Sequence, residues 1–239
     1  IQVLQLTQAR RRLLDQESRA GAASALIVGN PTMPQITFQL GGKPETLSAL
    51  PGAEQEAKTI ANLLQTQALV HDQATKSAVL ARLPNARIIH LATHGFLNDF
   101  EGQGIPGAIA LAPELKTAQP MAQPLGKIDG LLTASEILEL TLVADLVTLS
   151  ACDTGRGRIT GDGVIGLSRS WLAAGAASLV VSLWKVPDDS TVLLMTEFYR
   201  NLQQGQAKAE ALRQAMITTK AVYPDPIDWA AFTLIGNVE

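Results

Sequence analysis

The sequence is poor in cysteine, in excess charge of either sign and in long apolar runs. One cysteine in 239 residues excludes an internal disulfide framework and a zinc site built from several cysteines. The 19 lysines and arginines nearly balance the 22 aspartates and glutamates, so no overall basic field favours nucleic acid or an anionic membrane. The longest uncharged apolar stretch, Ser170 to Trp184, is shorter than the roughly 18 residues of a membrane-spanning helix. These features predict a soluble, cytoplasmic protein with no nucleic-acid partner and no membrane span.

The composition is that of a globular chain, with 46% hydrophobic and 17% charged residues. The chain opens at Ile1 without an initiator Met, and we expect residues 1–22 to form a polar-rich helix connecting to missing upstream sequence. Its basic run, Arg10 to Arg12, is too small a patch for a nucleic-acid-binding arm. No break in composition follows, so residues 23–239 are predicted to form one domain.

Short apolar runs alternate with amphipathic segments along this domain. Strands are predicted at 25–28, 68–70, 86–93, 145–150, 178–184 and 229–235, with a small extra strand at 108–111. Helices are predicted at 54–65, 75–83, 133–140, 163–174, 190–202 and 208–219. Thr133 and Glu136 are predicted to form a capping box at the start of the third of these helices. Continuously apolar strands separated by helices indicate a sheet that is mostly parallel and buried on both faces. We therefore expect an α/β fold with about six strands flanked by helices.

The single cysteine, Cys152, has three possible histidine partners for nucleophilic catalysis. Cys152 and His94 each come just past the end of a predicted strand. Functional residues of an open parallel sheet gather at the carboxyl ends of its strands, so these two side chains meet if their strands are parallel neighbours. His90 lies inside its strand, and His71 ends a more peripheral one. His94 is therefore the predicted partner of Cys152.

The chemistry of a thiol fits this pairing. An ordinary thiol has a pKa of about 8.5, so a nearby imidazole is needed to assist its deprotonation and to protonate the leaving amine. The backbone N–H groups of Gly95 and Cys152 are candidate donors for a developing oxyanion. Free cysteine is also a common core residue, so the spacing alone leaves a structural role for Cys152 open.

Two blocks of the sequence resemble the signatures of caspase-like cysteine peptidases. They are the hydrophobic block that ends in His94-Gly95 and the hydrophobic block that ends in Ala151-Cys152. Further stretches narrow the resemblance to the CHAT domain, the caspase-like domain associated with tetratricopeptide repeats. These stretches, in the expected order, are residues 50–54 (LPGAE), 90–95 (HLATHG), 149–155 (LSACDTG), 175–178 (GAAS), 182–188 (SLWKVPD) and 229–232 (WAAF).

The resemblance implies a caspase-hemoglobinase-like three-layer sandwich, a Cys/His dyad that needs no cofactor, and an upstream tetratricopeptide-repeat region. By position, His94 is the general base and acid and Cys152 the nucleophile of an endopeptidase that acts on protein or peptide substrates. The alternative is a signalling or scaffold module that keeps the fold and acts by binding protein partners, with little or no peptidase activity.

The substrate preference is less clear from the sequence. Asp153 is a candidate for an acidic pocket that accepts a basic residue before the scissile bond, whereas Arg156 and Arg158 in the same loop argue for the opposite. We expect the basic preference, with Trp184 at the exit of its strand as a wall of the pocket. For the imidazole of the dyad, Asn98 or Asp99 is a candidate orienting group.

Two other patterns are set aside. Residues 161–166 match the glycine spacing of a dinucleotide-binding turn. That turn must follow a strand directly, but here about ten residues separate the glycines from the preceding strand. His90 and His94 have the spacing of a zinc-binding helix, but the flanking isoleucines favour a strand and position 91 is Leu instead of Glu. No metal site is therefore predicted.

Overall fold

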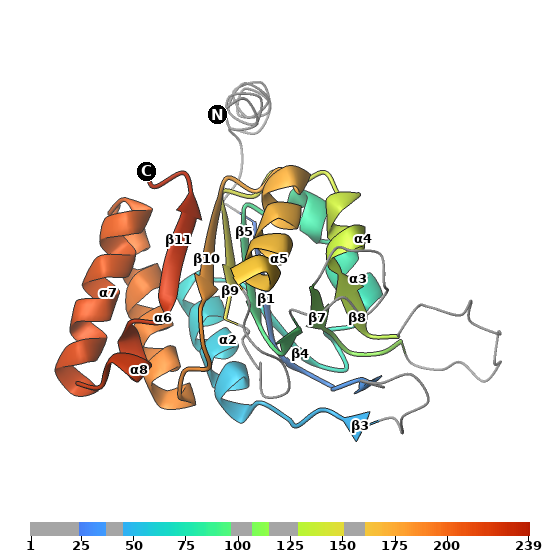
Figure 1. Cartoon of the computed structure of the whole chain (residues 1–239), viewed down its shortest axis with the longest axis horizontal. Coiled ribbons are helices and arrows are strands. Elements are labelled where there is room, and N and C mark those ends of the chain that lie inside the picture. Colours follow the sequence, from blue (N-terminus) through green and yellow to red (C-terminus); the bar gives the residue numbers. More distant parts are fainter. Residues whose placement is uncertain (1–23, 37–44, 97–106, 115–128, 151–160) are drawn as a thin grey trace.

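A six-stranded sheet forms the centre of the molecule (Figure 1). The computed structural model describes residues 24–36, 45–96, 107–114, 129–150 and 161–239, and the side chains of the last range from residue 167. The strand order is β11-β10-β9-β5-β1-β4. The strands are β1 (Ala25–Pro31), β4 (Ala68–His71), β5 (Ile88–Ala92), β9 (Leu146–Leu149), β10 (Ser178–Ser182) and β11 (Phe232–Gly236). Neighbouring strands pair in parallel except for β11, which runs antiparallel to β10. The predicted six-stranded, mostly parallel sheet is thus confirmed.

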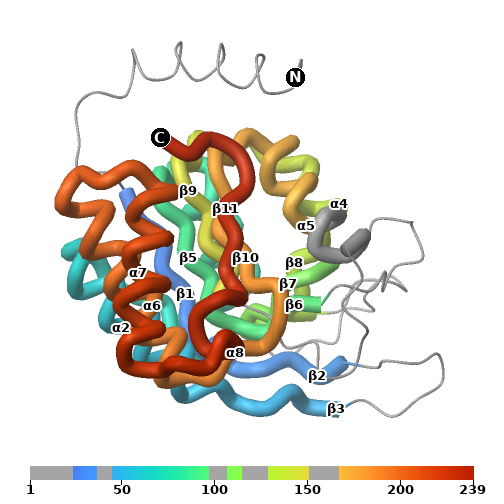
Figure 2. The backbone as a smooth tube through the Cα atoms, turned by 60° about the vertical axis from the view of Figure 1, so that its left-hand side comes forward, coloured from blue at the N-terminus to red at the C-terminus, as the bar shows by residue number. Residues whose placement is uncertain are grey.

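Helices cover both faces of this sheet, and Figure 2 shows the resulting three layers. One face carries α2 (Pro51–Leu63), α6 (Asp188–Gln203), α7 (Lys208–Val222) and the short α8 (Pro226–Trp229); the other carries α3 (Lys76–Leu80), η1 (Leu83–Asn85), α4 (Ala134–Leu138) and α5 (Gly161–Ala174). Strand residues divide between the two faces by alternation: Leu26 and Val28 join the core under α5, whereas Ile27 packs under α2 and α6. The inner strands β1, β5, β9 and β10 are buried on both sides, as their continuous apolar runs predict, whereas the edge strands β4 and β11 are partly exposed.

Two small antiparallel sheets complete the fold. One pairs β2 (Gln35–Ile36) with β3 (Glu45–Thr46), and the other has the order β6-β7-β8. The bounds of the latter strands are β6 (Gly95–Phe96), β7 (Ala108–Ala110) and β8 (Leu131–Thr133). Only β7 corresponds to a predicted strand, because two- and three-residue strands carry too little hydrophobic periodicity to be recognised.

Most local predictions hold, with shifts at the element ends. The predicted capping box of α4 is present: Thr133 Oγ1 accepts from the Glu136 N–H at 3.3 Å, and the Glu136 carboxylate accepts from the Thr133 N–H at 3.0 Å. The predicted helix 75–83 is shorter, because a separate 3₁₀ turn begins at Leu83 and includes Pro84. The last strand begins at Phe232 instead of 229, since α8 occupies the preceding residues.

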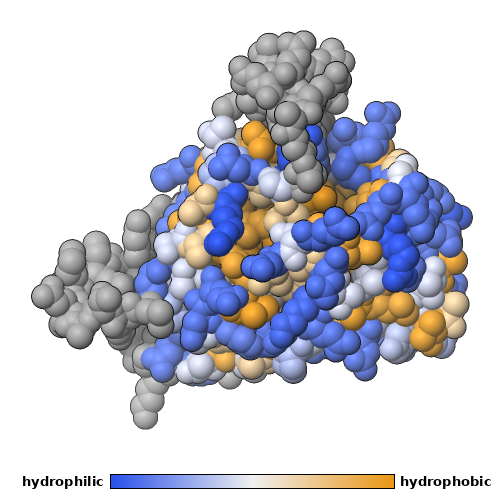
Figure 3. All heavy atoms as spheres, turned by 180° about the vertical axis from the view of Figure 1, so that it is seen from behind, coloured by the Kyte–Doolittle hydropathy of each residue, from blue (hydrophilic) through white to orange (hydrophobic). Residues whose placement is uncertain are grey.

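The surface mixes polar and apolar side chains. Seen from behind, apolar patches are interspersed with hydrophilic side chains (Figure 3). In the part of the chain that the structure describes, no helix is both long and apolar enough to cross a membrane. The predicted connecting helix over residues 1–22, and with it the predicted start of the domain, lies outside the described residues.

Gly175 ends α5 in a conformation that other residues rarely adopt. Its φ is +120°, and the N–H groups of Gly175 and Ala176 donate to the Leu172 and Trp171 carbonyls, which closes the helix. A Cβ at position 175 would lie 2.4 Å from the carbonyl oxygen of Leu142. Both the backbone angle and this close approach therefore require glycine.

We predict that Gly175→Ala lowers the free energy of unfolding by at least about 3 kcal/mol, because it adds a clash with backbone to the cost of a positive φ. Gly205→Ala is the matched control: Gly205 has φ +83° and no heavy atom within 4 Å of the place that a Cβ would take, so only about 1–2 kcal/mol is expected. Urea unfolding of both variants measures the difference. Equal losses would show that the contact with Leu142 does not matter.

Candidate functional site

The parallel pairing of β5 with β9 brings two chain segments to one edge of the sheet. His90 is level with Thr148 and Leu91 with Leu149, so both strands end together. The chain then leads to His94 from β5 and to Ser150 from β9. The sequence-based condition that these strands are parallel neighbours is therefore confirmed.

Several predicted site residues lie outside the described residues. They are Cys152, Asp153, Asn98 and Asp99, together with Arg156 and Arg158. His94, Gly95 and Trp184 are described, and the site is built from them and from the residues around them.

His94 is almost fully buried and is held by a backbone carbonyl. Its Nε2 lies 2.8 Å from the carbonyl oxygen of Ser48, in the segment between β3 and α2. A carbonyl can only accept, so Nε2 carries the proton and Nδ1 is the nitrogen able to accept one. Asn98 and Asp99, the candidate orienting groups from the sequence, lie outside the described residues. No sequence pattern marks a backbone carbonyl 46 residues earlier in the chain.

Gly95 opens β6 beside β7. The Ala110 N–H donates to the His94 carbonyl at 2.9 Å, and Gly95 is the residue paired with Ile109. This register makes Gly95 and Ile109 a non-hydrogen-bonded pair, whose N–H groups point away from the partner strand. The Gly95 N–H thus faces away from β7, the orientation that an oxyanion donor at this position needs.

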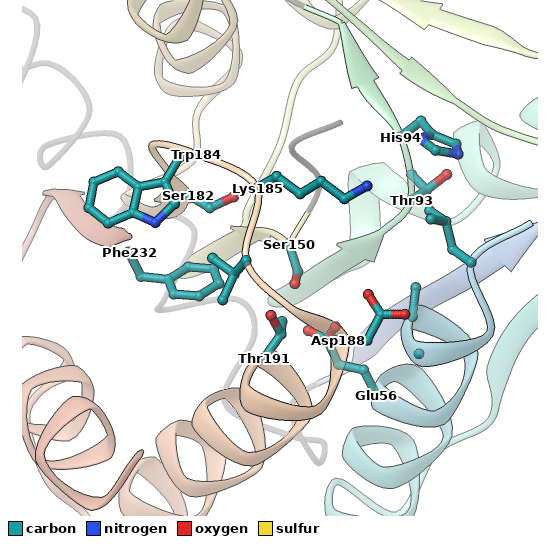
Figure 4. Close-up of a pocket in the computed structure, with 14 residues that line it drawn as sticks. Glu56, Thr93, His94, Ser150, Ser182, Trp184, Lys185, Asp188, Thr191 and Phe232 are labelled. Carbon is teal, nitrogen blue, oxygen red and sulfur yellow. The ribbon is translucent and has the colours of Figure 1, made fainter. Parts of the chain in front are cut away.

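A pocket opens beside His94, with a cavity volume of about 60 Å³. Figure 4 shows its polar lining, which comes from the start of α2, the strand ends and the segment between β10 and α6. These lining residues include Glu56, Thr93, Ser150, Ser182, Trp184, Lys185, Asp188 and Thr191. Trp184, whose Nε1–H donates to the Ile227 carbonyl at 3.1 Å, thus lines the same pocket as His94.

Glu56 belongs to a buried polar network that was not predicted from the sequence. Its Oε1 lies 3.1 Å from His90 Nε2, at ion-pair distance but without hydrogen-bond alignment. Tyr199 donates its hydroxyl proton to Thr148 Oγ1 at 2.9 Å, so its oxygen accepts from His90 Nδ1 at 3.2 Å. Burial raises the pKa of Tyr199 and keeps it protonated. The signal for Glu56 was its position on the apolar face of its helix, four residues before Ile60.

A second cluster holds the segment that carries Ser48. Asn30 Oδ1 accepts from the Leu50 N–H at 2.7 Å, and Asn30 Nδ2 donates to Glu54 Oε2 at 3.1 Å. Glu54 also accepts from Lys58 Nζ at 2.5 Å and lies 3.0 Å from His71 Nε2. The hydrogen bonds from Lys58 and Asn30 lower the pKa of Glu54 to about 2.

The family model of the CHAT domain matches residues 2–237. The chain belongs to the CHAT domain family. Tetratricopeptide repeat protein 28 of Mus musculus is 32% identical in an alignment 239 residues long, gaps included, that covers 89% of this chain and 9% of that protein. The Homo sapiens protein of the same name is 31% identical in an alignment 244 residues long that covers 91% of this chain and 10% of that protein. This CHAT chain therefore spans about a tenth of the length of these relatives.

A solved structure supports the fold of the CHAT domain. The crystal structure of the Arg specific cysteine proteinase gingipain R superposes with a TM-score of 0.56 at 11% sequence identity, over 91% of this chain and 46% of that chain. The caspase-like three-layer α/β architecture is thus confirmed.

The low pKa of Glu54 predicts an acid-dependent loss of stability. A carboxylate whose folded pKa lies below its ordinary value stabilises the protein above that ordinary value, and the gain disappears as pH falls toward 2. We expect Glu54→Gln to cost on the order of 1 kcal/mol at pH 7, because the site is partly exposed, and its deficit against the unsubstituted protein to shrink between pH 4.5 and 2.

Urea unfolding at pH 7, 4.5 and 3 measures this dependence. Glu210→Gln is the matched control, since Glu210 forms an exposed pair with Arg213 and should change stability little at any pH. A deficit for Glu54→Gln that does not vary with pH would contradict the prediction.

Proposed function

We propose that this CHAT domain is a cysteine endopeptidase with Cys152 as nucleophile and His94 as general base and acid. The observation that carries the proposal is the buried His94, whose Nε2 binds the Ser48 carbonyl at the sheet edge where Ser150 also lies. Two further residues lead from Ser150 to Cys152, and two residues of chain span at most about 7 Å. The thiol is therefore expected within reach of the imidazole.

The mechanism follows from the protonation of the imidazole. His94 Nδ1 takes the proton of the thiol, and the thiolate sulfur attacks the peptide carbonyl carbon. The N–H groups of Gly95 and Cys152 stabilise the negative oxygen of the tetrahedral intermediate. As the C–N bond breaks, His94 returns the proton to the leaving amine and a thioester remains. Water, deprotonated by His94, then hydrolyses the thioester and restores the thiol.

The pocket beside His94 is suited to the side chain that precedes the scissile bond. Two of its lining residues, Glu56 and Asp188, are acidic and one, Lys185, is basic, and Trp184 adds an apolar wall. Glu56 lies at ion-pair distance from His90, so the acidic groups that favour a cationic side chain are Asp188 and, from the sequence, Asp153. We therefore propose a preference for Arg or Lys at this position.

The proposal also includes the rest of the full-length protein. The matched relatives are named for tetratricopeptide repeats, which supports an upstream repeat region that controls access to the site. In this arrangement residues 1–22 connect that region to the domain at 23–239, and the whole protein works in the cytoplasm. The same relatives favour a second candidate function, a module that binds protein partners and does not cleave them.

Labelling with an electrophilic peptide tests the dyad. Since the chain has one cysteine, a peptidyl chloromethyl ketone can mark only Cys152 among its thiols. We expect Cys152→Ala to abolish both labelling and cleavage, and His94→Ala to lower kcat/KM by about 10²- to 10⁴-fold through loss of proton transfer. Thermal unfolding of both variants checks that the fold persists. Cleavage that survives Cys152→Ala would reject the cysteine peptidase, and labelling at an unchanged rate in His94→Ala would reject the dyad.

A library of peptides that differ before the scissile bond tests the pocket. We expect substrates with Arg or Lys to be cleaved at least about ten times faster than those with Asp. Asp188→Asn keeps the shape of the side chain and should reduce that preference by about three-fold, because it removes a carboxylate from the pocket lining. Asp189→Asn is the control, since Asp189 is the next residue, is also exposed and does not line the pocket. A preference for Asp, or an unchanged ratio in Asp188→Asn, would contradict the proposed specificity.

A further inference from the structure

Asn30 has an unusual backbone at the carboxyl end of β1. Its φ is +44°, a left-handed conformation that asparagine tolerates better than most non-glycine residues. The pairing of β1 with β4 shifts register between Gly29 and Pro31, so Asn30 sits at a bulge. Bulges of this kind re-aim a side chain, and here the side chain is 5% exposed and directed to the start of α2.

Both ends of the Asn30 amide are engaged. Its oxygen accepts from the Leu50 N–H at 2.7 Å, and its nitrogen donates to Glu54 at 3.1 Å. Leu50 is the N-cap residue of α2, and its carbonyl accepts from the Glu54 N–H at 3.2 Å. The segment before α2 is therefore fixed at Leu50 by two hydrogen bonds, from its N–H to Asn30 and to its carbonyl from the first turn of α2.

This segment also carries the carbonyl that binds His94. Ser48 is two residues before Leu50, and its oxygen accepts from His94 Nε2 at 2.8 Å. Leu50 itself lines the pocket beside His94. A displacement of the Leu50 backbone would move the Ser48 carbonyl and release the restraint on the imidazole.

We infer that Asn30 is a positioning residue, which fixes the Nε2-protonated tautomer of His94 through Leu50 and Ser48. Its effect on catalysis rests on the proposed peptidase function, whereas its effect on the tautomer does not. Asn30 does not line the pocket, and its side chain hydrogen-bonds to Leu50 and Glu54, so we expect it to act through the segment that it holds.

The tautomer can be measured directly by nitrogen-15 NMR of the histidine side chains. The chain has three histidines, and the signals that disappear in His94→Ala are those of His94. The measurement is made in the Cys152→Ala background near pH 9, where neutral imidazoles dominate in general. It therefore gives a result whether or not the protein is a peptidase.

Three variants separate the amide from the backbone conformation. Asn30→Gly accepts a positive φ but loses both hydrogen bonds. Asn30→Asp keeps the acceptor for the Leu50 N–H and is always combined with Glu54→Gln, so that the new carboxylate does not face that of Glu54. Thr32→Val is the matched control, because it removes another side-chain bond near the same strand end, from Thr32 Oγ1 to Asp72 at 2.5 Å, that does not reach residues 48–50.

We expect His94 to be protonated at Nε2 in the Cys152→Ala parent, in Asn30→Asp and in Thr32→Val, and to populate both tautomers in Asn30→Gly. With Cys152 restored, Asn30→Gly should lower kcat by about 10- to 100-fold with little change in KM, since a small misplacement of a catalytic group has an effect of this size. Asn30→Asp should stay within a few-fold of the unsubstituted protein.

The outcomes distinguish the two proposals. A pure Nε2 tautomer in Asn30→Gly, or equal losses in Asn30→Gly and Asn30→Asp, would overturn the role of Asn30 even if Cys152-dependent cleavage is found. A tautomer that changes as expected in a protein with no Cys152-dependent cleavage would support the positioning role and reject the peptidase.

Discussion

The parallel pairing of β5 with β9 is the constraint on which the site depends. Because the strands pair in register, His90 beside Thr148 and Leu91 beside Leu149, the chain leaves both strands at one level. The imidazole of His94 and the chain leading to Cys152 therefore start from the same edge. The helices on both faces bury every position of these strands except the partly buried Ile88, and a slip of one residue would exchange the two faces of a strand. The apolar packing of the sheet thus fixes the geometry of the polar edge.

The face of the sheet under α2 and α6 holds a group of polar side chains that lie against one another. His90 points to this face between the apolar neighbours Ile89 and Leu91, which point to the other. Tyr199 accepts from His90 Nδ1 and donates to Thr148, and Glu56, at ion-pair distance from His90 Nε2, extends the network to the pocket. A buried polar group is tolerated when it is paired and costly when it is not, so this network ties α2, α6 and two central strands to one arrangement. The shape of the pocket is consequently linked to the core of the domain.

Much of the fold and part of the site could be predicted from the sequence. The strands around His94 and the capping box of Thr133 are local patterns, and they were found because hydrophobic periodicity and capping residues lie within a few positions of each other. The support for His94 was not found, since it comes from a backbone carbonyl at Ser48. The role of Asn30, which stands between a glycine and a proline, could not be predicted either, because its bond to Leu50 links residues 20 apart in the chain. Such contacts have no spacing by which a single sequence reveals them.

The choice of a carbonyl to hold His94 has a chemical consequence. A carboxylate in this place would fix the same tautomer, but its full negative charge would also stabilise the imidazolium strongly. The neutral Ser48 carbonyl orients the ring while binding an imidazolium more weakly, so in the proposed mechanism a proton taken from the thiol would be easy to pass to a leaving amine. The position of a backbone carbonyl is set by the chain segment that carries it, however, so this segment must itself be fixed. The amide of Asn30 and the first turn of α2 supply that fixation, which explains why a strained asparagine is buried at the end of β1.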